Sequence, residues 1–123
     1  MSVDDTVTLA QGYLDAGRPF HAHEVLEALW KTRVPAERDL WQGLAQVAVG
    51  LTHTLRGNRT GAITLLRRGA SRLDAYLSGG RISHRVDVAG ARDFSLDVAE
   101  KLANGTDVTR EDAMFKLRGT PEP

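Results

Sequence analysis

Residues 40–55, which read LWQGLAQVAVGLTHTL, form the longest stretch of the chain without a charged residue. A helix that is apolar around most of its surface is normally the buried centre of a domain. Its sixteen residues fall short of the roughly 20 that a membrane-spanning helix needs. Gly43 and Gly50 have no side chains, so a neighbouring helix can approach closely there. The face predicted to be buried carries Trp41, Leu44, Ala45, Ala48, Thr52 and Leu55.

Helix caps and helix stops on either side of this stretch predict four further helices. Ser2 begins a capping box, and Pro19 and Pro35 fit the first turns of the next two helices. Asn58 and Asp87 are suited to N-cap positions. The predicted helical segments, with their caps, cover residues 3–16, 19–33, 35–56, 58–78 and 87–104.

The remaining features favour a purely helical chain. No segment shows the alternation of apolar and polar residues that is typical of a strand. Short connections imply that consecutive helices pack as antiparallel or steeply crossed pairs. Thr109 and Asp112 fit a second capping box, for a short last turn. The sequence therefore predicts an all-α fold, a compact array of about five helices in a single domain over residues 1–118, with a flexible tail at 119–123.

The composition is that of an ordinary globular protein. Hydrophobic residues make up 41% and charged residues 26% of the chain, and 16 basic side chains balance 16 acidic ones. Zero net charge gives no global attraction to nucleic acid or membranes, and Arg67, Arg68 and Arg72 are interpreted as a solvated face. The absence of cysteine excludes disulfides and thiolate metal sites. No signal segment follows Met1, so we expect a cytoplasmic protein that binds neither membranes nor nucleic acid.

A polar stripe runs along the central helix. Gln42, Gln46 and His53 stack along one side of it, with Val49 between them. Buried amides and imidazoles are unfavourable unless they are hydrogen-bonded. We therefore expect a neighbouring helix to supply polar groups that meet this stripe.

The preceding helix offers such groups. His23 and Glu27 lie one turn apart among apolar neighbours, whereas His21 faces solvent. An imidazole and a carboxylate at this spacing can give two ligands to one metal or form an acid–base pair. With His53 they would make a three-ligand site for zinc, manganese or nickel, leaving one position open for water, as a metal-dependent hydrolase needs. The residues predicted to surround these ligands are Trp30, Gln42, Gln46, Arg56 and Asn58.

Several strings of this sequence resemble one known family. They are FHAHEVLEALW at residues 20–30, which contains His-x-x-x-Glu-x-x-Trp, then WQGLAQ at 41–46 and HTLRGN at 53–58. In this order they are similar to the blocks of the domain-of-unknown-function 309 family of bacteria and archaea, over residues 20–77. The resemblance implies an all-helical orthogonal array and a suggested metal-binding role for His23 and Glu27.

The same polar residues allow other interpretations. They can form a hydrogen-bonded network that fixes the crossing of two helices, and the protein would then be a ligand-free helical scaffold or a protein-interaction module. A metal-free pocket for a small organic ligand is a third hypothesis. No nucleophile motif or phosphate-binding glycine loop points to a reaction. The sequence leaves open whether the protein is an enzyme, what small molecule it binds and whether it forms a homo-oligomer.

Overall fold

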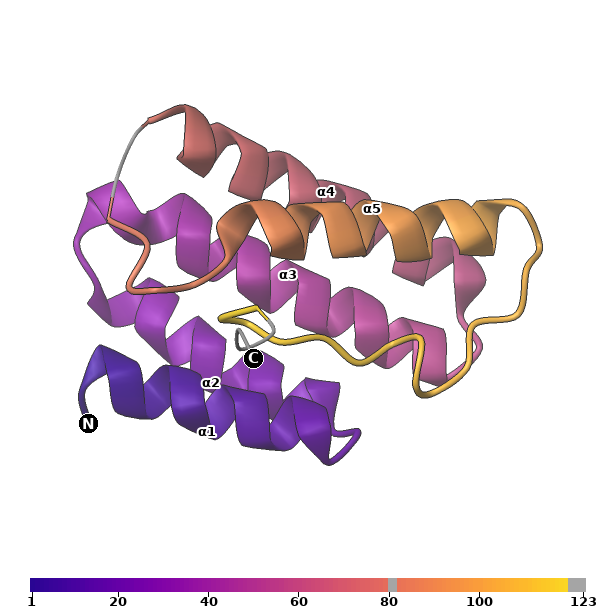
Figure 1. The fold of residues 1–123 in the computed structure, drawn as a ribbon, viewed down its shortest axis with the longest axis horizontal. Coiled ribbons are helices and arrows are strands. Elements are labelled where there is room, and N and C mark those ends of the chain that lie inside the picture. Colours follow the sequence, from indigo (N-terminus) through magenta and orange to yellow (C-terminus); the bar gives the residue numbers. More distant parts are fainter. Residues whose placement is uncertain (80–81, 120–123) are drawn as a thin grey trace.

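The computed structural model of the protein describes residues 1–79 and 82–119, and the chain is helical through most of them (Figure 1). No strand occurs in these residues, which confirms the predicted all-α fold. The elements are α1 (Val3–Asp15), α2 (Pro19–Thr32), the 3-10 helix η1 (Pro35–Glu37), α3 (Arg38–Leu55), α4 (Arg59–Ser78) and α5 (Val88–Ala103).

Three of the predicted helix starts are stabilised by side-chain caps. Ser2 Oγ accepts a hydrogen bond from the backbone N–H of Asp5 at 3.0 Å. Asn58 and Asp87 accept in the same way from the N–H groups three residues further on, at 3.1 and 3.0 Å. Such a cap contributes about 1 kcal/mol to the stability of a helix. These caps are local in sequence, so the starts could be predicted without tertiary information.

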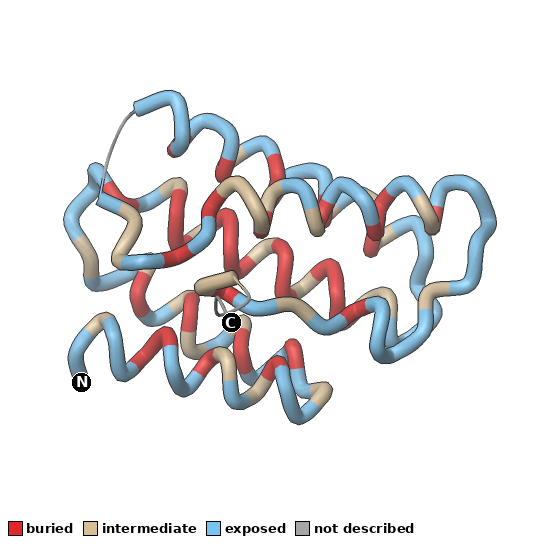
Figure 2. Tube along the Cα trace, in the orientation of Figure 1, coloured by how far each residue is buried: buried red, intermediate tan, exposed pale blue. Residues whose placement is uncertain are grey.

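Helix α3 lies at the centre of the fold, between α2 and α4 (Figure 1). Helix α1 packs on α2, and α5 packs on α4. Buried residues follow α3 along most of its length (Figure 2). The uncharged stretch therefore forms the core, as predicted. Its side chains with no exposed surface are Leu40, Trp41, Leu44, Val47 and Leu51.

Glycines allow α3 and α4 to cross at close range. A Cβ atom added at Gly43 would lie 3.2 Å from the carbonyl oxygen of Gly69, and one added at Gly50 would lie 2.6 Å from Leu66 Cγ. Side chains at these positions would force the two helices apart. The predicted close approach at Gly43 and Gly50 is confirmed, and α4 is the helix that makes it.

The start of α3 differs from the prediction. The α-helix begins at Arg38, because Pro35–Glu37 form a 3-10 turn instead of the first α-helical turn. The backbone N–H of Arg38 bonds to the carbonyl of Pro35, which is the tighter i→i+3 pattern. The side chain of Glu37, at the end of this turn, is buried.

The segment after α5 is irregular but anchored. The predicted capping box forms, since Thr109 and Asp112 each donate a backbone N–H to the other's side chain at 3.1 Å, around a turn. Gly119 donates its N–H to the carbonyl of Lys116 at 3.0 Å. The rest of the predicted flexible tail, residues 120–123, lies outside the described residues. Within the described part of the chain, no helix has the length and apolar character needed to cross a membrane.

Candidate functional site

The pair predicted on the second helix forms in the structure. His23 Nε2 lies 3.0 Å from Glu27 Oε2, and Lys31 Nζ lies 2.9 Å from Glu27 Oε1. The side chains of His23 and Glu27 are 21% and 30% exposed. The hydrogen bond from Lys31 lowers the pKa of Glu27 below its ordinary value, and the nearby His23 acts in the same direction. Glu27 is thus an ionised carboxylate with a cationic neighbour on its solvent side.

The hydrogen bond to Glu27 indicates the tautomer of His23. Because an ionised carboxylate only accepts, the imidazole must donate from Nε2. Its Nδ1 is buried and has no hydrogen-bond partner among the described residues. In the neutral ring, Nδ1 is then an acceptor without a donor, and Nε2 orients the carboxylate.

A pocket of about 170 Å³ lies between α2 and α3 beside this pair. The amides of Gln42 and Gln46, from the predicted stripe, line it. The amide of Gln46 is held by α4, because Gln46 Oε1 accepts a hydrogen bond from Arg72 Nε at 3.1 Å. Arg72 also contacts Asp39 at 3.3 Å, so it is a partly buried bridge and not part of a solvated strip. The residues that line the pocket are His23, Glu27, Trp30, Gln42, Ala45, Gln46 and Val49.

Three residues expected at this site lie elsewhere. His53 is on the same helix as Gln46 but about 10 Å further along its axis. Its Nδ1 lies 3.1 Å from the side-chain nitrogen of Asn58, in the turn that follows α3. The guanidinium of Arg56 lies 5.9 Å from the centre of the Phe20 ring. None of these three residues lines the pocket, so the helical phase of His53 was right and its depth along the helix was not.

The predicted metal ligands are therefore brought together only in part. Among residues 1–79 and 82–119, no group of three His, Cys, Asp or Glu side chains lies close enough to hold a metal ion. His23 and Glu27 fit as two neighbours of a cation, and Gln42 and Gln46 carry the other side-chain oxygens of the lining. These groups suit an ion that keeps most of its water, not a closed structural site.

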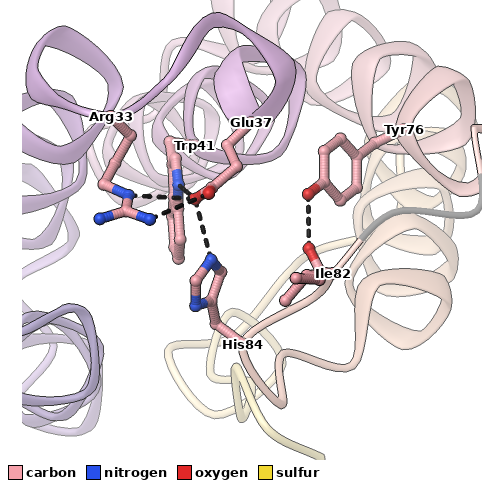
Figure 3. A network of polar contacts seen from close by, with 6 residues as sticks. All are labelled: Arg33, Glu37, Trp41, Tyr76, Ile82 and His84. Carbon is pink, nitrogen blue, oxygen red and sulfur yellow. Dashed lines mark hydrogen bonds and ion pairs between the residues drawn. The ribbon is translucent and has the colours of Figure 1, made fainter.

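A second polar cluster, around Glu37, was missed by the sequence reasoning (Figure 3). Arg33 binds both carboxylate oxygens of Glu37, Nε to Oε1 at 3.1 Å and Nη2 to Oε2 at 3.0 Å. Trp41 Nε1 donates to Oε1 at 3.0 Å, and His84 Nε2 lies 2.8 Å from the same oxygen. The hydrogen bonds from Arg33 lower the pKa of Glu37 to about 2, and those from Trp41 and His84 act in the same direction against the effect of burial.

The cluster attaches the connection between α4 and α5 to the start of α3. His84 and Arg85 both have positive φ, 53° and 62°, a region that is unfavourable for residues other than glycine. The bond from His84 to Glu37 and the ion pair of Arg85 with Asp4, at 3.3 Å, hold this backbone in place. The one sequence signal for this cluster was the spacing of four residues between Arg33, Glu37 and Trp41. His84 could not be predicted to join it, because it lies 47 positions from Glu37.

The comparisons with known proteins bear on the first site. The sequence model of the family described as "Domain of unknown function (DUF309)" matches residues 7–65, which include α2, α3 and the whole lining of the 170 Å³ pocket. No curated protein and no solved structure matches the chain. The resemblance found in the sequence is confirmed: residues 7–65 of this chain match the domain-of-unknown-function 309 family.

Proposed function

We propose that the pocket between α2 and α3 binds a divalent cation, with Glu27 as its charged ligand. The observation that carries the proposal is the charge of the pocket wall: of its seven lining residues, Glu27 alone has a formal charge at neutral pH when His23 is neutral. Carboxylate and amide oxygens are donors suited to hard divalent ions such as manganese. Zinc and nickel would additionally need the imidazole of His23 as a ligand.

The size of the pocket supports an ion over an organic molecule. Pockets for drug-sized ligands have volumes of roughly 300–1,000 Å³, whereas this one has about 170 Å³. The donor set supports weak binding, since two or three protein donors leave most of the coordination to water. The proposal concerns cation binding, for which His23 and Glu27 are the ionisable side chains of the described lining.

The ammonium of Lys31 would compete with the ion for the carboxylate of Glu27. It occupies Glu27 Oε1 at 2.9 Å and is itself 63% exposed. A divalent cation at the carboxylate would face repulsion from this charge or have to displace it. An exposed pair of this kind is worth up to about 1 kcal/mol, which corresponds to about a fivefold change in affinity.

The test is calorimetric titration of manganese, zinc and nickel into the untagged parent and three variants. We expect dissociation constants near millimolar for the parent, a severalfold tightening in Lys31→Ala and a loss of binding in Glu27→Gln. Lys101→Ala is the matched control, because Lys101 forms a similar i,i+4 pair with Asp97 at 3.3 Å on α5. Heats of binding that are absent from both the parent and Lys31→Ala, or unchanged in Glu27→Gln, would show that the His23–Glu27 pair is a structural contact of a ligand-free scaffold.

A further inference from the structure

A second pocket, unrelated to the first, lies between α1 and the C-terminal segment. This segment runs back across the helices after α5 (Figure 1), and Lys116 Nζ reaches Asp15 Oδ1 at 2.8 Å. The pocket has a volume of about 440 Å³, within the range of small-molecule sites. We propose that it binds a small amphipathic carboxylate, a single carboxylate group attached to a short apolar chain.

The floor and mouth of the pocket favour an apolar chain. Val7 and Leu117, which line it, are almost completely buried, with 1% and 0% of their surface exposed. Gly12 also lines it, and a Cβ atom added there would meet nothing within 4 Å. The space above Gly12 is therefore open to a ligand that contacts the apolar floor.

Gln11 makes this wall rigid without offering a free donor. Its side-chain nitrogen donates to the carbonyl of Phe115 at 3.0 Å, and to Asp15 Oδ1 at 2.8 Å. Its side-chain oxygen accepts from the backbone N–H of Leu117 at 2.7 Å. With its oxygen and its nitrogen both engaged, the amide fixes the C-terminal segment against α1, and recognition of a ligand must come from other groups.

Arg118 supplies the unused donor. Its Nε is buried and has no hydrogen-bond partner among the described residues, whereas its Nη2 binds Asp4. A buried donor without an acceptor is unfavourable, and more so when it belongs to a charged group. An acceptor oxygen of a ligand that hydrogen-bonds to Arg118 Nε would remove this unfavourable term, and ligand binding would be stabilised accordingly.

The charges around the pocket are of both signs, and they include the carboxylate of Asp87 beside Gly119. The two cations of the rim, Lys116 and Arg118, already neutralise Asp15 and Asp4, and Arg85 adds a further positive charge at Asp4. The hydrogen bond from Lys116 keeps the pKa of Asp15 below its ordinary value, so that this carboxylate stays ionised and paired. A guanidinium donor beside an apolar floor matches a single carboxylate with an apolar chain.

The test uses octanoate as the probe and follows the backbone amides of Gly12 and Leu117 and the Nε–H of Arg118 by two-dimensional NMR of the full chain. We expect saturable shifts with a dissociation constant of about 1 mM or lower. Octanol and acetate each lack one half of the proposed ligand, and both should bind at least tenfold more weakly. Saturation by octanol equal to that by octanoate would overturn the carboxylate assignment.

Two variants address the site from opposite sides. Arg118→Met removes the donor but keeps a long side chain, and it should weaken octanoate binding at least tenfold. Gly12→Leu fills the mouth from an exposed helical position, where leucine favours the helix, and it should abolish binding in a folded protein. Arg67→Met, on the exposed surface of α4, should bind like the parent. The proposal is overturned if the parent shows no saturable shifts, or if Arg118→Met and Gly12→Leu both bind octanoate as the parent does.

Discussion

Replacing Gly69 with alanine is expected to lower the free energy of unfolding by about 2 kcal/mol. The added Cβ atom would lie 2.8 Å from Val47 Cγ2, 2.9 Å from the carbonyl oxygen of Gly43 and 3.0 Å from the backbone nitrogen of Val47. Two of these three atoms belong to the backbone of α3 and cannot rotate away, so the two helices must separate. Overpacking of this kind destabilises by about 1–3 kcal/mol, more than alanine gains from its higher helix propensity.

Gly12→Ala is the matched control for this prediction. Both glycines lie inside helices, but a Cβ atom at Gly12 would meet no atom within 4 Å. This variant should therefore gain about 0.5–1 kcal/mol from helix propensity alone. Urea unfolding of both variants and the parent measures the difference. Equal effects of the two substitutions would show that α3 and α4 do not approach at Gly69 as closely as described.

The close crossing is one part of the fold that the sequence could predict. Glycines and uncharged stretches can be recognised directly in a sequence. Within residues 40–55, the ten positions 42–51 carry no polar side chains other than the amides of Gln42 and Gln46, so the burial of this stretch could be predicted from its local composition. The caps at Ser2, Asn58 and Asp87 are equally local, since each binds an N–H three residues away. These features depend on neighbours in the chain and not on the packing of distant elements.

Helical phase could predict which faces of α2 and α3 form the candidate site, but not which residues lie at the same position along the two helices. Phase placed His23 and Glu27 on one side of α2 and Gln42 and Gln46 on the facing side of α3, and the pocket brings these four together. Phase says nothing about how far along α3 the axis of α2 crosses. His53 has the correct phase but lies beyond the crossing, where it contacts the turn after α3 instead.

Contacts between distant segments could not be predicted either, because local sequence patterns do not show how distant elements pack. The bond of Glu37 with His84 joins the start of α3 to the connection after α4, so it depends on how α3 and α4 pack. The anchoring of Leu117 by Gln11 likewise spans 106 positions. Neither contact has a periodic or composition signal, because each consists of one polar side chain in an otherwise ordinary segment.

Replacing Glu37 with leucine is expected to cause a large loss of stability. The carboxylate is 12% exposed and accepts hydrogen bonds from Arg33, Trp41 and His84. Leucine leaves the N–H of Trp41 buried without an acceptor and releases the strained backbone at His84. Loss of one partner from a buried ionic cluster is worth about 3–5 kcal/mol, and we expect the lower end because Arg33 can reach water.

Two comparisons test whether burial is the cause. Glu37→Gln keeps one acceptor oxygen and should lose about half as much stability as Glu37→Leu. Glu27→Leu is the matched control, because Glu27, like Glu37, binds one imidazole and one cation. Both partners of Glu27 lie one helical turn away, and its side chain is 30% exposed. Partly exposed pairs contribute about 1 kcal/mol or less. If Glu27→Leu and Glu37→Leu had the same effect on urea unfolding, the special role of the Glu37 cluster would be wrong.

The pH dependence of the same variants gives an independent reading of the cluster. The pKa of Glu37 is depressed from 4.5 to about 2 in the folded state, so the unfolded chain binds the proton more readily. The stabilisation is therefore complete above about pH 4.5 and is lost as the pH falls toward 2, a total of about 3 kcal/mol. Asp15, Glu27 and Asp112 also have depressed pKa values, and all three remain in Glu37→Leu. The difference in unfolding free energy between parent and Glu37→Leu should therefore shrink by about 1.4 kcal/mol per pH unit in this window. A difference that stays constant from pH 5 to pH 3 would mean that folding does not lower the pKa of Glu37.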